Sequence, residues 1–112
     1  MSEYDLKWSP GEKKIARKAY ELAYQREMED MKNEIEKRIA NLKENQDIWA
    51  LEDFLYDRRQ EMAEKYDYRY SVLMIVFMRL LQEGYLKVED LKGLAEDKII
   101  RIKESAASLQ RK

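Results

Sequence analysis

The chain has 112 residues, with 22 basic and 23 acidic side chains and a net charge of −1, which is enough for one domain but not for two cores of ordinary size. It contains neither cysteine nor histidine, and this excludes disulfides, thiolate metal sites and the commonest general base. With three glycines, one proline and many good helix formers, the composition predicts a few long helices. We expect a single all-α domain over residues 1–112 that holds no cofactor and no metal.

The chain ends and the apolar stretches bear on where the protein works. The first five residues are acidic and polar, which predicts that there is no signal peptide. The longest apolar stretch, residues 72–81, is interrupted by Arg79 and is far shorter than the ~20 residues of a membrane span. We therefore expect a cytoplasmic protein that does not span a membrane.

A capping box predicts the start of the first helix. Ser9 is a good N-cap, Pro10 is tolerated in the first turn, and Glu12 stands where the box requires an acid. We expect this helix to run from Pro10 to Asn45, about 54 Å at ~1.5 Å per residue, whereas a compact globule of this chain length is only ~35 Å across. Apolar side chains recur along it at spacings of three and four: Ile15, Ala19, Leu22, Met28, Met31, Ile35, Ile39 and Leu42.

The length of this helix predicts self-association. A helix that overhangs its own domain exposes its apolar stripe to water, and a second copy of the chain is the simplest cover. The stripe is too short to require a sustained heptad coiled coil, so we expect helices that cross at an angle. The predicted protein is a homodimer formed through the long helices, with an interface at Met28, Met31, Ile35, Ile39 and Leu42.

Three shorter helices are expected to follow. The second is predicted from Asp47, as N-cap, to Lys65, and the third from Tyr68 to Glu83. The fourth is expected from Val88 to Ser108, with a weak point or break at Gly93. The third helix is apolar around most of its circumference and should be the most buried element. The predicted buried stripe of the second helix is Ile48, Leu51, Leu55 and Met62, with Phe54 at its edge.

The opposite face of the second helix carries Trp49, Asp53, Tyr56 and Gln60, with Glu52 and Arg59 beside them. A tryptophan on the polar side of an amphipathic helix has two interpretations. Trp49 either packs against a neighbouring helix or a dimer mate, or it belongs to a binding patch, since Trp, Tyr and Arg anchor protein interfaces.

Catalysis and nucleic-acid binding are both disfavoured. Phosphate loops, nucleophile elbows and EF-hand loops are absent from the sequence, and the di-iron sites of helix bundles need histidine. Basic and aromatic residues do mix at 58–59 and 65–70, which is a pattern that can stack on bases. Interspersed acids at 57, 61, 64 and 67 neutralise that stretch. We expect neither an enzyme nor a nucleic-acid binder.

The second and third helices resemble a known family. The stretch Asp47 to Leu55 followed by Arg58-Arg59 reads W-x-L-x-D-F-L-x-x-R-R at its core, and Lys65 to Val72 reads K-Y-D-x-R-x-S-V. These motifs are similar to those of the fluorescence recovery protein of cyanobacteria, and the resemblance covers nearly the whole chain.

The resemblance implies an all-α dimer that binds the C-terminal domain of photoactivated orange carotenoid protein. Such a protein speeds the return of its partner to the dark, orange form and thereby ends quenching of phycobilisome fluorescence. Family residues carry over as Trp49, Asp53 and Arg59. Glu52 stands where the family usually has His, Ile75 where Phe is common, and Arg101 where Lys is seen. We expect a partner surface of Trp49, Glu52, Asp53, Tyr56, Arg59 and Arg101, which can act on a carotenoid-binding partner at the thylakoid antenna.

A second interpretation is kept open. Fluorescence-recovery-like proteins outside the antenna system, or a reconstructed sequence, would share the dimeric helical fold and serve a different partner.

Overall fold

The computed structural model describes residues 7–110. Residues 1–6, which include the polar start from which the absence of a signal peptide is predicted, and residues 111–112 lie outside that range. The helices are α1 (Pro10–Ala40), α2 (Asn45–Lys65), α3 (Leu73–Glu83), the 3₁₀ helix η1 (Val88–Leu91) and α4 (Glu96–Gln110). This all-helical architecture confirms the predicted fold class.

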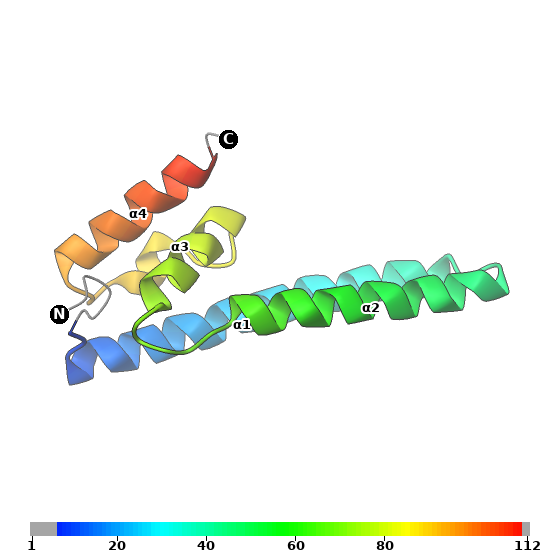
Figure 1. Cartoon of the computed structure of the whole chain (residues 1–112), viewed down its shortest axis with the longest axis horizontal. Helices are drawn as coiled ribbons and strands as arrows, with labels where there is room; N and C mark the ends of the chain where they lie inside the picture. Colours follow the sequence, from blue (N-terminus) through cyan, green and yellow to red (C-terminus); the bar gives the residue numbers. More distant parts are fainter. Residues whose placement is uncertain (1–6, 111–112) are drawn as a thin grey trace.

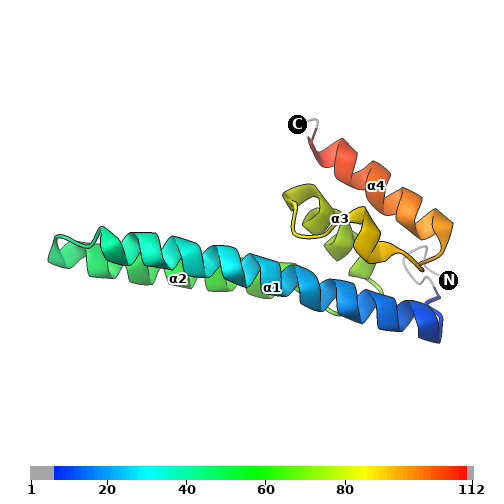
Figure 2. The same cartoon turned by 180° about the vertical axis from the view of Figure 1, so that it is seen from behind.

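Two parts make up the molecule, which measures 54 × 26 × 24 Å. Helix α2 turns back and runs antiparallel along the far half of α1, and we call this pair the hairpin. The elements α3, η1 and α4 pack over the first half of α1 and form what we call the head (Figures 1 and 2). The far half of α1 is therefore not a bare overhang, as the sequence suggested, because α2 of the same chain covers one side of it.

The turn between α1 and α2 lies earlier than predicted. Helix α1 ends at Ala40 rather than at Asn45, since the Asn41 side chain donates to the carbonyl oxygen of Lys37 at 2.8 Å and competes with the next helical turn. Asp47 is not the N-cap of α2, which begins at Asn45. Its carboxylate instead accepts the backbone N–H groups of residues 43 and 44, both at 2.9 Å, and closes the turn.

The third and fourth helices are also shorter than predicted. Helix α3 begins at Leu73 rather than at Tyr68, because residues 66–72 form a loop whose tyrosine rings pack on α1. The expected helix from Val88 to Ser108 is split into η1 and α4. The break lies at Gly93, as the sequence suggested, where a φ of +107° is accessible to glycine and costly for other residues.

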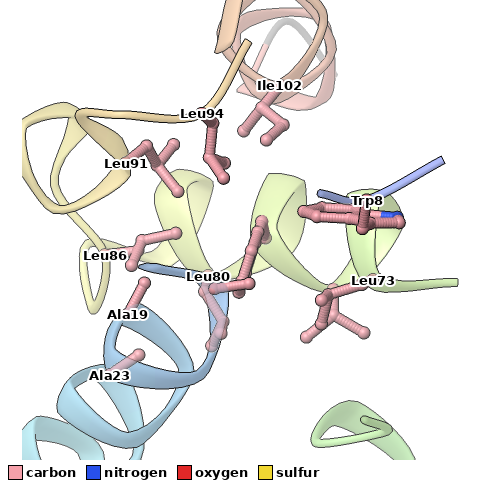
Figure 3. Close-up of a cluster of buried hydrophobic side chains, with 12 residues drawn as sticks. Trp8, Ala19, Ala23, Leu73, Leu80, Leu86, Leu91, Leu94 and Ile102 are labelled. Carbon is pink, nitrogen blue, oxygen red and sulfur yellow. The ribbon is translucent and has the colours of Figure 1, made fainter. Parts of the chain in front are cut away.

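The hydrophobic core lies in the head, where α3 packs between α1, η1 and α4 (Figure 3). Small residues of α1, Ala16, Ala19 and Ala23, are fully buried there and allow η1 to approach α1 closely. Figure 3 shows Ala19 and Ala23 below Leu80 and Leu86, with Trp8 beside α3. As predicted, α3 is the most buried helix, with Leu73, Val76, Phe77 and Leu80 in the core.

The predicted capping box at the start of α1 is confirmed. The backbone N–H of Glu12 donates to the Ser9 hydroxyl at 3.1 Å, and that of Ser9 donates to the Glu12 carboxylate at 3.0 Å. The box satisfies two amides that the helix itself leaves free.

Candidate partner-binding surface

The predicted patch on α2 lies on the surface of the chain. Trp49 is 64% exposed and Tyr56 is 62% exposed, and Glu52, Asp53 and Arg59 are exposed as well. These five residues, which we call the α2 patch, follow one side of a regular helix. Within the single chain Trp49 is therefore not buried against another helix, and its ring is accessible to a partner surface.

Arg101 does not join the α2 patch. It lies on α4 and lines a polar hollow of about 360 Å³ with Lys7, Asp97 and Lys98. Helix α4 packs over the first half of α1, whereas the start of α2 lies at the far end of the hairpin (Figure 1). Ile75, on α3, is also exposed. A partner that contacts both Trp49 and Arg101 must therefore reach along the length of the molecule.

An apolar groove runs between the outer sides of α1 and α2. Its volume is about 530 Å³. We call it the hairpin groove, and it is lined by Tyr20, Tyr24, Met28, Met31, Leu55, Arg59, Met62, Ala63 and Tyr66. Two of the predicted dimer residues, Met28 and Met31, thus lie in it, and Arg59 belongs both to the groove and to the α2 patch.

The other three predicted dimer residues are distributed differently. Ile39 is 54% exposed, near the end of α1. Ile35 is half-buried. Leu42 is also half-buried and lines a small hollow between the end of α1 and the start of α2, together with Leu51. Leu42 therefore packs at least partly within its own chain.

The buried stripe of α2 differs from the predicted one. Met62 is buried, but Ile48 is 53% exposed and Leu55 lies at the open groove. The side chains that face α1 instead include Phe54, whose ring lies 4.0 Å from the guanidinium carbon of Arg38, and Lys65. The sequence prediction failed because it followed the large aliphatic residues, and the helix is turned so that two of them face outward.

A buried charged cluster explains this orientation. The Glu27 carboxylate, only 1% exposed, accepts hydrogen bonds from Lys65 Nζ at 2.6 Å, Arg58 Nη2 at 2.9 Å and Tyr66 Oη at 2.8 Å. Lys65 Nζ also donates to Glu83 of α3 at 2.6 Å. We call these five residues the Glu27 cluster, and it joins α1, α2, the following loop and α3 at one point.

The Glu27 cluster also affects ionisation. Burial, reinforced by the hydrogen bond to Glu27, raises the pKa of Tyr66. Burial would also raise the pKa of Glu83, but hydrogen bonds from Lys65 and Arg79 outweigh it and lower that pKa. At neutral pH the cluster therefore contains a neutral tyrosine and an ionised Glu83.

Sequence reasoning did not identify the Glu27 cluster, although one signal was present. Ala16, Ala19 and Ala23 are small residues at helical spacing, which marks a close approach of another element. Glu27 is the next member of that stripe, four residues after Ala23, and it is buried like the others. A charged residue that continues a stripe of buried alanines needs buried partners of opposite charge.

Aromatic rings connect the head core to the hairpin groove. Neighbouring ring centres along this row lie 4.8–5.8 Å apart, at distances typical of favourable edge-to-face contacts. The row consists, in order, of Trp8, Tyr70, Tyr68, Tyr20, Tyr66 and Tyr24. The loop of residues 66–72 thus packs on α1 through its tyrosines, which the basic–aromatic pattern of that stretch did not reveal.

Comparison with known proteins decides the family. Residues 8–106 match the model of the photoprotection regulator fluorescence recovery protein. The chain belongs to the fluorescence recovery protein family. It is 38% identical over 99 residues to the fluorescence recovery protein of Synechocystis sp., an alignment that covers 88% of this chain and 91% of that protein.

Solved structures of the family share the fold. The fluorescence recovery protein of Fremyella diplosiphon superposes with a TM-score of 0.83 at 39% identity, over 95% of this chain and all of that one. The Synechocystis sp. PCC 6803 protein gives a TM-score of 0.85 at 38% identity, over 90% of this chain and 99% of that one. The resemblance stated from the two α2–α3 motifs is therefore confirmed, and the chain is a member of a family of photoprotection regulators. No helix within residues 7–110 combines the length and the apolarity that crossing a membrane requires.

Proposed function

We propose that this protein binds the C-terminal domain of photoactivated orange carotenoid protein, accelerates its return to the dark form and so ends quenching of phycobilisome fluorescence. The observation that carries the proposal is the α2 patch, on a chain of this family. It presents Trp49, Tyr56 and Arg59 on one side of a regular helix. These are the residue types that dominate binding energy at protein interfaces. Because the backbone of a helix is already ordered, binding a partner costs little further backbone entropy.

The proposed activity needs no catalytic group of the chain. A protein that binds the transition state of a conformational change more tightly than its starting state lowers the barrier without covalent chemistry. The acidic side chains of Glu52 and Asp53 beside Trp49 favour a partner surface with basic residues around an apolar pocket. Because the partner docks on the antenna, the protein would act in the cytoplasm.

A homodimer is part of the proposal, with the hairpin groove as the interface. The groove exposes Met28, Met31 and Leu55 on the outer side of the hairpin, and a second copy would cover them.

The charge distribution favours an antiparallel arrangement of the two copies. Residues 29–64 hold six basic and eleven acidic side chains, a net charge of −5, whereas residues 7–28 and 65–110 together hold fourteen basic and ten acidic ones, a net charge of +4. Antiparallel hairpins bring the negative part of each copy towards the positive part of the other.

A direct test is the dark decay of photoactivated orange carotenoid protein, followed by absorbance in the presence of this chain. We expect the return to the orange form to become faster in proportion to the chain added at micromolar concentration. An unchanged decay would reject the proposed activity.

The second candidate is the same dimeric helical fold serving a different partner. Glu52 supports it, because this exposed acid adds a negative charge to a patch that already holds Asp53. A pull-down with the isolated C-terminal domain of orange carotenoid protein separates the two candidates. Retention of the chain supports the first, and its absence at micromolar concentration supports the second.

A further inference from the structure

The contact between α1 and α2 includes charged residues beside Met62 and Phe54, while two of the large aliphatic residues of α2 stay outside it. Arg58 and Lys65 point at the buried Glu27, while Ile48 and Leu55 face outward. An amphipathic helix that follows hydrophobicity alone would be turned further about its axis, so that Leu55 and Ile48 faced α1 as well. The aliphatic and charged positions of α2 therefore favour different rotations of the helix, and the observed rotation is the one that satisfies the charges.

The charges can decide the rotation because they are buried. Turning α2 about its axis to bury Leu55 would draw Arg58 and Lys65 away from Glu27. That carboxylate would then lose both of its cationic partners and keep only the Tyr66 hydroxyl, which costs more than burying one leucine gains. In coiled coils a single buried polar side chain selects the register in the same way.

We propose that Glu27 is a positioning residue that sets the rotation of α2 on α1 and thereby keeps the hairpin groove, with Arg59 of the α2 patch beside it, on the surface. Two residues of the Glu27 cluster connect directly to those surfaces. Arg58 precedes Arg59 in the chain, and Tyr66, which donates to Glu27 at 2.8 Å, also lines the groove. The effect on partner binding rests on the proposed function, whereas the rotation of α2 does not.

The rotation can be read directly because the chain has no cysteine of its own. Leu51→Cys reports the side of α2 towards α1, and Leu55→Cys reports the outer side. We expect the cysteine at position 55 to react with a maleimide faster than the one at position 51. Labelling is done at a dilution where light scattering gives a monomer, so that a second copy does not protect either thiol.

An apolar replacement of the cluster then separates positioning from stability. The triple variant Glu27→Leu, Arg58→Leu, Lys65→Met removes all three charges that α1 and α2 contribute to the Glu27 cluster. The remaining charged residue of the cluster, Glu83, keeps its hydrogen bond from Arg79 at 3.0 Å. Well-packed apolar replacements of buried ion pairs are often as stable as the original. We expect this variant to melt at or above the wild-type temperature, to lose at least threefold in the labelling ratio of position 55 to position 51, and to bind the carotenoid-protein domain at least tenfold more weakly.

Two further variants complete the design. Glu27→Gln removes the buried negative charge that faces Arg58 and Lys65, which then keep only Glu61 and Glu83 as ion-pair partners. We expect a lower melting temperature together with a reduced labelling ratio. This single variant tests the proposal if the triple variant does not fold. The control is Asp67→Asn with Arg69→Gln, which removes an exposed ion pair in the loop after α2 and should leave the labelling ratio and binding at wild-type values.

The outcomes are distinct. A folded triple variant that keeps the wild-type labelling ratio overturns the proposal, whether or not its binding is weaker. If the wild-type chain does not bind the carotenoid-protein domain, the proposed function fails, while the labelling ratio still decides the role of Glu27.

Discussion

The ammonium nitrogen of Lys98 lies 2.8 Å from a carboxylate oxygen of Glu12 and joins the start of α4 to the first turn of α1. The second carboxylate oxygen of Glu12 accepts the backbone N–H of Ala95, also at 2.8 Å. One side chain therefore completes the capping box of α1 and holds α4 against it. The hydrogen bond from Lys98 is the main reason why the pKa of Glu12 falls from 4.5 to about 2.

This relationship predicts a pH dependence of stability. Because the pKa of Glu12 is lower in the folded protein than in the unfolded chain, its contribution is complete above pH 4.5 and is lost as the pH falls towards 2. We expect Glu12→Gln to lower the free energy of unfolding by roughly 1 kcal/mol at pH 7, a value reduced for solvent screening, and by much less at pH 2.5. Urea unfolding followed by circular dichroism measures both, with Glu29→Gln as an exposed control. An equal loss at the two pH values would show that the charge of Glu12 is not responsible.

The two glycines with positive φ should differ in their tolerance of alanine. Gly84 has a φ of +87° and open space around its Cα, so Gly84→Ala is expected to cost about 1 kcal/mol of conformational strain. At Gly93 a Cβ would overlap the Cδ1 of Ile15 in addition to the strain. We expect Gly93→Ala to cost at least about 2 kcal/mol, measured by thermal unfolding. Combining it with Ile15→Val, which removes that methyl group, should recover part of the loss. If the second change recovers nothing, the clash is not the cause.

The α2 patch predicts variants that separate binding from folding. Trp49→Leu and Arg59→Leu should each weaken binding to photoactivated orange carotenoid protein by about 2 kcal/mol or more, since they remove anchors of the interface. Both side chains are exposed in the single chain, so helicity and melting temperature should remain as in the wild type. Lys14→Leu, at an exposed position of α1 away from the α2 patch, serves as the control. A marked fall in melting temperature with Trp49→Leu would instead show that Trp49 is a packing residue of the folded protein.

The hairpin groove predicts where the dimer can be split. Met31→Glu places a charge among Met28, Leu55 and Tyr24, where a second copy would leave it unpaired and buried. We expect light scattering to give the 13.6 kDa monomer for this variant and a dimer for the wild type. Ile75→Glu, at an exposed position of the head, should remain dimeric. A dimeric Met31→Glu protein would place the interface elsewhere.

Much of the fold could be predicted because its signals are local. The capping box at Ser9 and the apolar run of α3 depend only on neighbouring residues, and both are confirmed, although α3 begins later than predicted. The helix ends were less predictable, because Asn41 and Asp47 make hydrogen bonds to backbone groups that compete with a continuing helix. The sequence did not predict the pairing of α1 with α2, because the contact includes the Phe54 ring beneath the Arg38 guanidinium rather than a regular apolar seam.

In the candidate site, too, local features could be predicted from the sequence and long-range contacts could not. The helical period places Trp49 and Tyr56 on the polar side of α2 but leaves open whether Trp49 packs against a neighbouring helix, and only the structure shows that both side chains are exposed in the single chain. The burial of Glu27 could not be derived from its own neighbourhood, because it depends on Arg58 and Lys65, more than 30 residues away in the chain. Long-range ion pairs leave no periodic pattern, and their effect on the rotation of a helix appears only in three dimensions.

The two tryptophans occupy opposite environments, and this makes the chain its own spectroscopic probe. Trp8 is buried beside Tyr70, with the Lys98 ammonium 4.4 Å from its ring, whereas Trp49 stands in water on the hairpin. Emission from Trp8 should lie at shorter wavelength and change only when the head opens, while the longer-wavelength emission of Trp49 should shift when a surface covers it. One fluorescence spectrum can therefore follow docking and unfolding as separate events in the same cuvette, without an added dye.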